Sequence, residues 1–329
     1  MTLLTPHLIL VALAALWTLI AATVLLILLS HALRRGRSRH REELDRRARP
    51  LVVRFALAEE DDPALEGTLA RASGAFGDRV DERLLSVLET LRGDSRERIV
   101  ALLVDRGHPP RLRRRARSRR TTVRAAALRR LGQLALPTDE DLIRGATADP
   151  SPVVAAIAIR AAASYPGRAS VAAALKRLRG RGEVPALVVV TSLIAQGAAS
   201  ADALAAIREG LADPSSRVRA ACAQTLGELT STADAAALGR LLRRDPTPGV
   251  QLAAATALER VGRASAVPAL LDGTRSPWGP VRTHSLLALL ALPREVTAAA
   301  LAEVARRPDP LLTPLLAAQP APPSPEAHP

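Results

Sequence analysis

The sequence predicts an all-α protein in which an N-terminal transmembrane helix precedes a right-handed α-solenoid of helical hairpins. Three observations lead to this fold class. An uncharged, apolar stretch lies near the N-terminus, Asp-Pro pairs recur at a spacing of about 32 residues, and a helical apolar pattern recurs at the same spacing. Since 48% of the 329 residues are hydrophobic, the chain has enough apolar side chains for a core.

The first element is the uncharged stretch over residues 8–29. As a helix rising ~1.5 Å per residue it would reach about 33 Å, the thickness of a bilayer core. The stretch is longer than the apolar region of a cleaved signal peptide and runs into basic residues rather than a small-residue cleavage site. We therefore predict a retained transmembrane helix over residues 8–29.

The flanking charges predict the orientation of this helix. Residues 34–49 hold eight Arg against three acids, whereas no charged side chain precedes His7. The positive-inside rule then places the N-terminus outside and the rest of the chain in the cytoplasm, as a single-pass protein of the inner cell membrane.

The next two segments are less regular. Residues 30–63 are expected to form a basic juxtamembrane helical linker. Residues 64–120 carry leucines at helical spacing and are expected to be a degenerate capping repeat that covers the open end of a helical stack.

The following segment, residues 121–307, shows a regular repeat. Asp-Pro pairs begin at Asp149, Asp213, Asp245 and Asp309, and Ser276-Pro277 stands at the mark between the last two. The interval of 64 residues from Asp149 to Asp213 is twice the period. Apolar or small residues follow at i, i+3, i+4, i+7, i+8 and i+11, which predicts about six units, each with a first helix that buries one face. The units start this pattern at Val123, Val154, Ala186, Val218, Val250 and Val281. A second helix follows in each unit, and hairpins this short must stack on one another to bury their apolar faces.

The pattern Asp-Pro-x-x-x-Val-Arg-x-Ala, present from Asp213 to Ala221, resembles the short HEAT-like repeats of bacteria, including those related to phycobilisome lyases. The resemblance covers about residues 120–307 and implies that the protein binds other proteins. The chain departs from the pattern at Ala186, where the Pro turn is shifted, and at Ala155 and Gln251, where the Arg is missing. Residues 308–329 are rich in Pro and are expected to be a disordered tail.

Arginines are concentrated before the array. Residues 111–130 hold ten Arg and no acid, in a chain of net charge +14. This run is a candidate contact for anionic lipid headgroups or for an acidic partner, and a solvated helix face is the alternative. The candidate residues are Arg111, Arg113, Arg114, Arg115, Arg117, Arg119 and Arg120.

No pattern predicts catalysis. Phosphate-binding loops and the common hydrolase and metalloprotease motifs are missing from the sequence, and one cysteine cannot form an internal disulfide. Cys222 replaces an Ala on the apolar stripe and is expected to be inert, while His284 on the same stripe is expected to pack or to hydrogen-bond locally. We therefore predict no catalytic residue, no cofactor, no metal and no small-molecule substrate.

These observations together predict a membrane-tethered scaffold that binds partner proteins through the surface of its second helices. A bilin-lyase-like enzyme is one alternative, implied only by the resemblance. A nucleic-acid-binding solenoid that uses the Arg-rich segment is the other. We do not expect nucleic acid as a partner, because only 2% of the residues are aromatic and the charge is confined to one part of the chain.

Overall fold

The computed structural model describes residues 16–20, 22–26, 42–58, 62–180 and 184–318. These residues form helices and connecting turns, without strands. The chain divides into two compact units, residues 1–109 and residues 110–329.

The prediction of a transmembrane helix over residues 8–29 is wrong for the part of the chain that the structure describes. None of the helices there is both long enough and apolar enough to cross a membrane. Residues 8–15, 21 and 27–29 lie outside the described residues. The localisation derived from this helix, a single pass through the inner membrane with cytoplasmic repeats, is overturned with it.

The first unit contains a helix over residues 42–57, followed by α2 (Pro63–Arg71), α3 (Gly74–Val87) and α4 (Asp94–Asp105). The helix α2 begins where Asp62 accepts a hydrogen bond from the Leu65 N–H and Pro63 takes the first helical position. The large side chains that are fully buried in this unit are Leu69, Leu84, Leu88, Ile99, Leu102 and Leu103.

A buried ion pair joins two helices of the first unit. Arg106, just after α4, donates from Nε to Asp81 on α3, and both side chains are 6% exposed. The same guanidinium donates to the carbonyl oxygens of Leu69 and Ala72, at the end of α2. One side chain at the end of α4 thus joins the end of α2 to the middle of α3.

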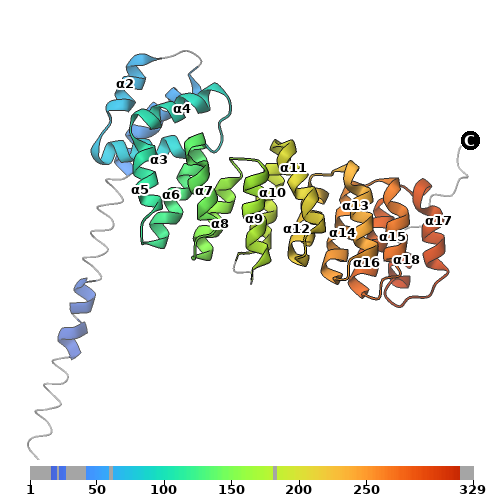
Figure 1. Ribbon diagram of the computed structural model, residues 1–329. Coiled ribbons are helices and arrows are strands. Elements are labelled where there is room, and N and C mark those ends of the chain that lie inside the picture. The colour runs from blue at the N-terminus through green and yellow to red at the C-terminus, as the bar shows by residue number, and fades with distance from the viewer. Residues whose placement is uncertain (1–15, 21, 27–41, 59–61, 181–183, 319–329) are drawn as a thin grey trace, which may run out of the picture. The chain divides into compact units, whose positions relative to one another are not determined.

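The second unit is a stack of helical hairpins (Figure 1). It starts within the first turn of α5 (His108–Ala116). The first helices of the six hairpins are α6 (Thr121–Leu134), α8 (Pro152–Ala162), α10 (Ala186–Ala199), α12 (Ser216–Glu228), α14 (Pro248–Val261) and α16 (Gly279–Ala291). The second helices are α7 (Glu140–Ala146), α9 (Arg168–Arg179), α11 (Ala201–Glu209), α13 (Ala235–Arg244), α15 (Val267–Gly273) and α17 (Arg294–Ala305).

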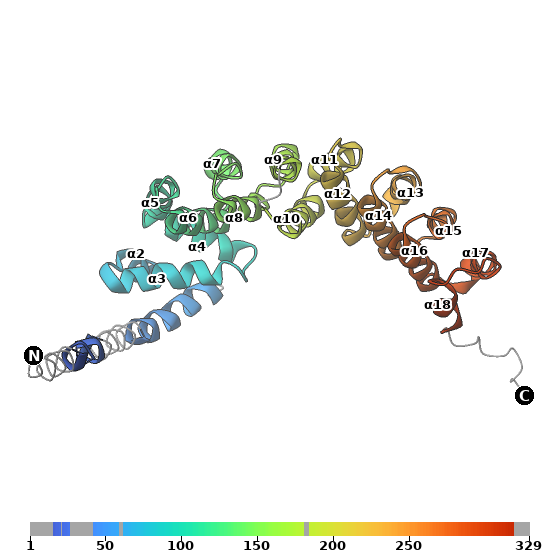
Figure 2. The ribbon, with the colours of Figure 1, turned by 90° about the horizontal axis from the view of Figure 1, so that it is seen from below.

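The first helices form one row and the second helices form another, so that each hairpin packs on the next (Figure 2). The repeating apolar stripe supplies the core between the rows. Val218, Val250 and Val281, which hold the same place in three units, are 0%, 1% and 1% exposed. The solenoid architecture therefore follows from the 32-residue apolar repeat.

Small residues let the first helices approach one another closely at two places. A Cβ added to Gly132 on α6 would lie 2.6 Å from the Ala161 Cβ on α8. A Cβ added to Gly227 on α12 would lie 2.6 Å from the Ala257 Cα on α14. Only glycine fits at these two contacts, because no real side chain tolerates such a distance to backbone.

The C-terminal end of the array departs from the expected disorder over 308–329. Residues Thr313–Ala317 form the short helix α18, and Leu312 is buried against Leu286 and Val304. These leucines cover the apolar end of the last hairpin, and this burial outweighs the local density of Pro. Residues 319–329 lie outside the described residues.

Candidate functional site

The turns between hairpins are built by the repeated Asp-Pro pair. Asp149, Asp213 and Asp245 each accept at Oδ1 a hydrogen bond of 2.9 Å from the N–H two residues later. This contact is an Asx turn, in which the carboxylate satisfies a backbone donor just before a first helix begins. The aspartate is thereby fixed at the edge of the array, with its other oxygen directed to the preceding unit.

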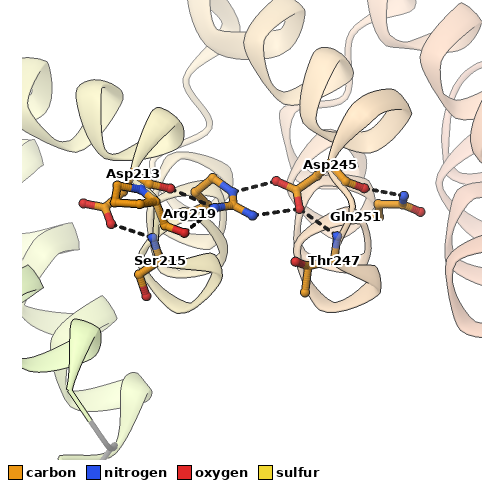
Figure 3. A network of polar contacts seen from close by, with 7 residues as sticks. Asp213, Ser215, Arg219, Asp245, Thr247 and Gln251 are labelled. Carbon is orange, nitrogen blue, oxygen red and sulfur yellow. Dashed lines mark hydrogen bonds and ion pairs between the residues drawn. The ribbon is translucent and has the colours of Figure 1, made fainter.

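The Asp245 carboxylate is reached by an arginine from near the start of α12, the first helix of the preceding hairpin (Figure 3). Arg219 donates from Nε and Nη2 to the two oxygens of Asp245, at 2.6 and 3.0 Å. Its Nη1 donates to the backbone oxygens of Asp213 and Pro214 in its own turn. Each such arginine therefore joins two successive turns, and we call this set of contacts the arginine ladder.

Two further charged contacts of the same kind occur along the array. Arg124 donates to both oxygens of Asp149 and to the oxygens of Ser118 and Arg119. Arg282 Nε lies 2.9 Å from Asp309 Oδ2 as an ion pair, and its Nη1 donates to the oxygens of Ser276 and Pro277. The ladder thus repeats with the period of the sequence.

Where the aspartate is replaced, the arginine is replaced with it. Ser276 occupies one aspartate position, and Gln251 occupies the matching arginine position. Ser276 Oγ donates to Gln251 Oε1 at 3.1 Å, while Gln251 Nε2 donates to the backbone oxygen of Asp245. A neutral pair of side chains therefore substitutes for a charged one at this contact.

We expect the charged and neutral contacts to be interchangeable only as pairs. The double variant Gln251→Arg/Ser276→Asp should match or exceed the stability of the natural chain, because it recreates the Arg219–Asp245 contact. Each single variant should lose about 1 kcal/mol, because it leaves a charge opposite a neutral partner. Urea unfolding of the four proteins gives the coupling energy between the two positions, and a coupling below about 0.5 kcal/mol would contradict the pairing.

The carboxylates of the ladder are held in the ionised state. The Asp245 side chain is 3% exposed and the Arg219 side chain 14%. Burial alone would raise the pKa of Asp245, but the hydrogen bonds from Arg219 and from the Thr247 N–H outweigh it, and the pKa lies below its usual range. The pKa of Asp213 is lowered in the same way, with Arg179 and the Ser215 N–H opposing burial. These aspartates are therefore engaged anions and are not free to bind a ligand.

A cleft of about 600 Å³ opens between α11 and α13, beside the ladder contact of Figure 3. Its apolar floor is formed by the half-buried side chains of Leu211, Ala237 and Leu241. Its carboxylates are Glu209, Asp213 and Asp245, and its arginines are Arg208, Arg219, Arg240 and Arg244. We call it the Arg240 cleft.

All three carboxylates of the Arg240 cleft already have arginine partners. Glu209 is bound by Arg168, Asp213 by Arg179 and Asp245 by Arg219. Arg208 pairs with Asp234. Arg240 and Arg244 are exposed, and neither has an acidic partner among the described residues. The cleft therefore presents two available guanidinium groups beside an apolar floor.

The structure places the candidate residues of the Arg-rich run in α5 and in the turn after it. Arg113 is bound within the array, because it donates to Asp139 and, at 2.7 Å, to Thr138 Oγ1. The other six candidates are exposed, namely Arg111, Arg114, Arg115, Arg117, Arg119 and Arg120. The run is therefore divided between one structural arginine and a row of exposed ones, and it lines none of the clefts found at α10–α18.

Cys222 and His284, the two potentially reactive side chains noted in the sequence, contact only nearby residues of the array in the interactions described for them. Cys222 is fully buried on α12 and faces Gly210, and burial raises the pKa of its thiol to about 12. His284 Nδ1 lies 3.1 Å from the Pro280 oxygen, one turn earlier on α16. In the part of the chain that the structure describes, no three His, Cys, Asp or Glu side chains gather where they could hold a metal ion.

The Arg240 cleft is not singled out by the sequence reasoning, which follows the density of charge along the chain. A different signal was present. Arg240 and Arg244 are four residues apart on a second helix, and an Asp-Pro pair follows them directly, so one face of a helix brings both side chains to a turn.

Comparison with known proteins identifies the repeats. A family model of a HEAT repeat matches residues 203–233, and a family model of HEAT repeats matches residues 235–318. No curated protein matches the chain.

Several solved structures are similar to the chain at low identity. Human deoxyhypusine hydroxylase in complex with glycerol is 17% identical with a TM-score of 0.31, covering 78% of this chain and 98% of its own. The complex of CpcE and CpcF of phycocyanin lyase from Nostoc sp. PCC7120 is 16% identical with a TM-score of 0.30, covering 76% and 96%. Kap121p is 11% identical with a TM-score of 0.37, covering 81% of this chain and 44% of its own. From residue 203 to residue 318, the helical hairpins of this chain are thus HEAT repeats.

Proposed function

We propose that this protein is a non-catalytic scaffold that binds an acidic segment of a partner protein in the Arg240 cleft. The observation that carries the proposal is the pair Arg240 and Arg244, which have no acidic partner in a cleft whose own carboxylates are all engaged. A HEAT-repeat solenoid supports the proposal, because its extended surface is suited to holding another chain.

The chemistry of the cleft selects the class of segment. Guanidinium groups on successive turns of one helix bind carboxylates by charge-assisted hydrogen bonds, which are stronger than neutral ones. Leu211, Ala237 and Leu241 offer an apolar surface next to these groups. A segment with Asp or Glu next to an apolar side chain satisfies both parts of the cleft.

The engaged carboxylates keep the cleft from binding cations. Asp213 and Asp245 have lowered pKa values because arginines and backbone N–H groups hold the ionised form. Their charges are neutralised within the array, so the local excess of charge at the cleft is positive. This balance favours acidic partners over basic ones.

A random-peptide display selection against the full chain tests the proposal. We expect the selected peptides to combine acidic and apolar residues. The double variant Arg240→Gln/Arg244→Gln should weaken binding of a selected peptide about tenfold, measured by fluorescence anisotropy, because it removes both charge-assisted contacts.

The chain offers a matched control in Arg243, which lies between the two arginines on α13, is exposed and does not line the cleft. Arg243→Gln should leave the affinity within about twofold of the natural chain. The proposal is wrong if the selected peptides carry no acidic residue, or if Arg243→Gln weakens binding as much as the double variant does.

A further inference from the structure

The arginine ladder is interrupted in the middle of the array. Ala155 takes the arginine position on α8 and is fully buried, so no charged side chain leaves α8 toward the next turn. The sequence has no aspartate between Asp149 and Asp202 that could accept from it. Among the described residues, which leave out 181–183, no contact of the ladder type joins the α8–α9 hairpin to the α10–α11 hairpin.

The next ladder position is also changed. Leu187 stands on α10 where Arg124, Arg219 and Arg282 stand in other units, and it is 68% exposed. Its aspartate, Asp213, is bound instead by Arg179 from the end of α9. This ion pair passes over the α10–α11 hairpin, so the ladder does not hold the first helix of this hairpin. Its second helix, α11, is joined to the neighbouring hairpins by the Arg168–Glu209 and Arg208–Asp234 ion pairs.

Buried polar side chains lie in the interface between α10 and α8. Gln196 on α10 is fully buried, and its Oε1 has no hydrogen-bond partner among the described residues. Its Nε2 donates to Ser192 Oγ, which in turn donates to the Ile159 oxygen on α8. Polar side chains thus occupy an interface that glycine and alanine close tightly at α6–α8 and at α12–α14.

An unsatisfied buried amide oxygen lowers the cost of opening an interface. Leaving a buried acceptor without a partner costs about 1–3 kcal/mol, and this cost is recovered when water reaches the group. Opening at α10 also breaks no ladder contact, whereas opening at α12–α14 would separate Arg219 from Asp245. Both effects lower the cost of opening the stack at α10.

We infer that the α10–α11 hairpin (Ala186–Glu209) is a hinge, at which the hairpins before it and those after it change their relative angle. The Arg179–Asp213 ion pair, with side chains 50% and 5% exposed, is one tether that limits the motion, and the Arg168–Glu209 and Arg208–Asp234 ion pairs hold the second helix of the hairpin. A ladder arginine restored at position 187 should reduce the motion, since Leu187 and Asp213 have the same separation in sequence as Arg219 and Asp245.

Distance distributions between spin labels on the full chain test the hinge. Cysteines replace Arg160 on α8, Gln224 on α12 and Leu287 on α16, which are exposed and equivalent positions of their first helices. The pair 160/224 spans α10, and the pair 224/287 spans α14. Cys222 is buried and takes no label under native conditions.

We expect the 160/224 distribution to be about twice as wide as the 224/287 distribution, as for a motion of packed hairpins about one weak interface. Leu187→Arg should narrow the 160/224 distribution to the width of the control pair. Arg179→Gln should broaden it further. Neither variant should alter the 224/287 distribution.

Equal widths for the two pairs in the natural chain would overturn the hinge. So would a Leu187→Arg variant that leaves the 160/224 width unchanged. The effect of Arg179→Gln on the 160/224 width tests the hinge independently of Leu187→Arg. This variant removes a half-exposed side chain of the ion pair and changes no residue of α10 or of its core.

Discussion

Replacing Arg106 with alanine should unfold the first unit at moderate urea, with a loss of about 3–5 kcal/mol. The variant leaves Asp81 ionised and buried without its guanidinium partner. It also removes the donor to the oxygens of Leu69 and Ala72, so the end of α2 loses its attachment to α4. Hydrogen exchange followed by mass spectrometry should show the loss in α2–α4.

The control for this variant is Arg54→Ala in the same unit. Arg54 pairs with Asp62 while its own side chain is 70% exposed, so its removal should cost less than about 1 kcal/mol. A loss of that small size for Arg106→Ala would contradict a structural role of the buried pair.

The same pair predicts the response of the first unit to acid. Burial raises the pKa of Asp81, but hydrogen bonds from His108 and Arg106 outweigh it, so the pKa in the folded chain lies below the ordinary value of 3.8. A depressed pKa stabilises the fold above the unfolded-state pKa, and this stability is lost as the pH falls through the folded-state pKa. The contribution of Asp81 should therefore be fully present near neutral pH, begin to decline near about pH 4, and be lost progressively as the pH falls further.

Gly227→Ala should destabilise the second unit by about 1–3 kcal/mol, the second large effect that we expect. The added Cβ would lie 2.6 Å from the Ala257 Cα and 2.7 Å from its Cβ, so α12 and α14 would have to move apart. This movement also strains the Arg219–Asp245 contact at the edge of the same interface. Thermal unfolding monitored by circular dichroism measures the loss.

Gly145→Ala is the matched control, because Gly145 lies in α7 and a Cβ there would meet nothing within 4 Å. Alanine has the higher helix propensity, so this variant should gain up to about 1 kcal/mol. If the two substitutions change stability in the same direction, the close approach of α12 and α14 is not what requires glycine at position 227.

Much of the array was predictable because its determinants are local and repeated. The apolar stripe that starts at Val218 or Val250 depends only on helical periodicity, and the structure buries both valines. Local periodicity did not predict that Arg219 pairs with Asp245. It lies 26 residues away, and only the stacking of hairpins brings the two together.

The transmembrane prediction failed because hydropathy was its only basis. An apolar stretch over 8–29 meets the length criterion for a membrane span, yet none of the described helices is both long enough and apolar enough to cross a membrane. The candidate site in the Arg-rich run was predicted from charge density alone, and it stays a prediction. The run 111–120 is dense in Arg, whereas Arg240 and Arg244 stand out only once the paired arginines around them are identified.

The arginine ladder also determines where this array can be shortened without damage. Joining Val250 directly to Arg282 removes the neutral pair as a whole, and each remaining arginine of the later repeats keeps its carboxylate, Asp245 for Arg219 and Asp309 for Arg282. Joining Arg244 to Ser276 removes the same length of chain at the loop, but it sets Arg219 opposite a serine. The repeating unit that keeps every charged pair intact therefore begins inside a first helix, at the ladder arginine. A fusion or deletion with its boundary in the loop between hairpins would separate an arginine from its aspartate.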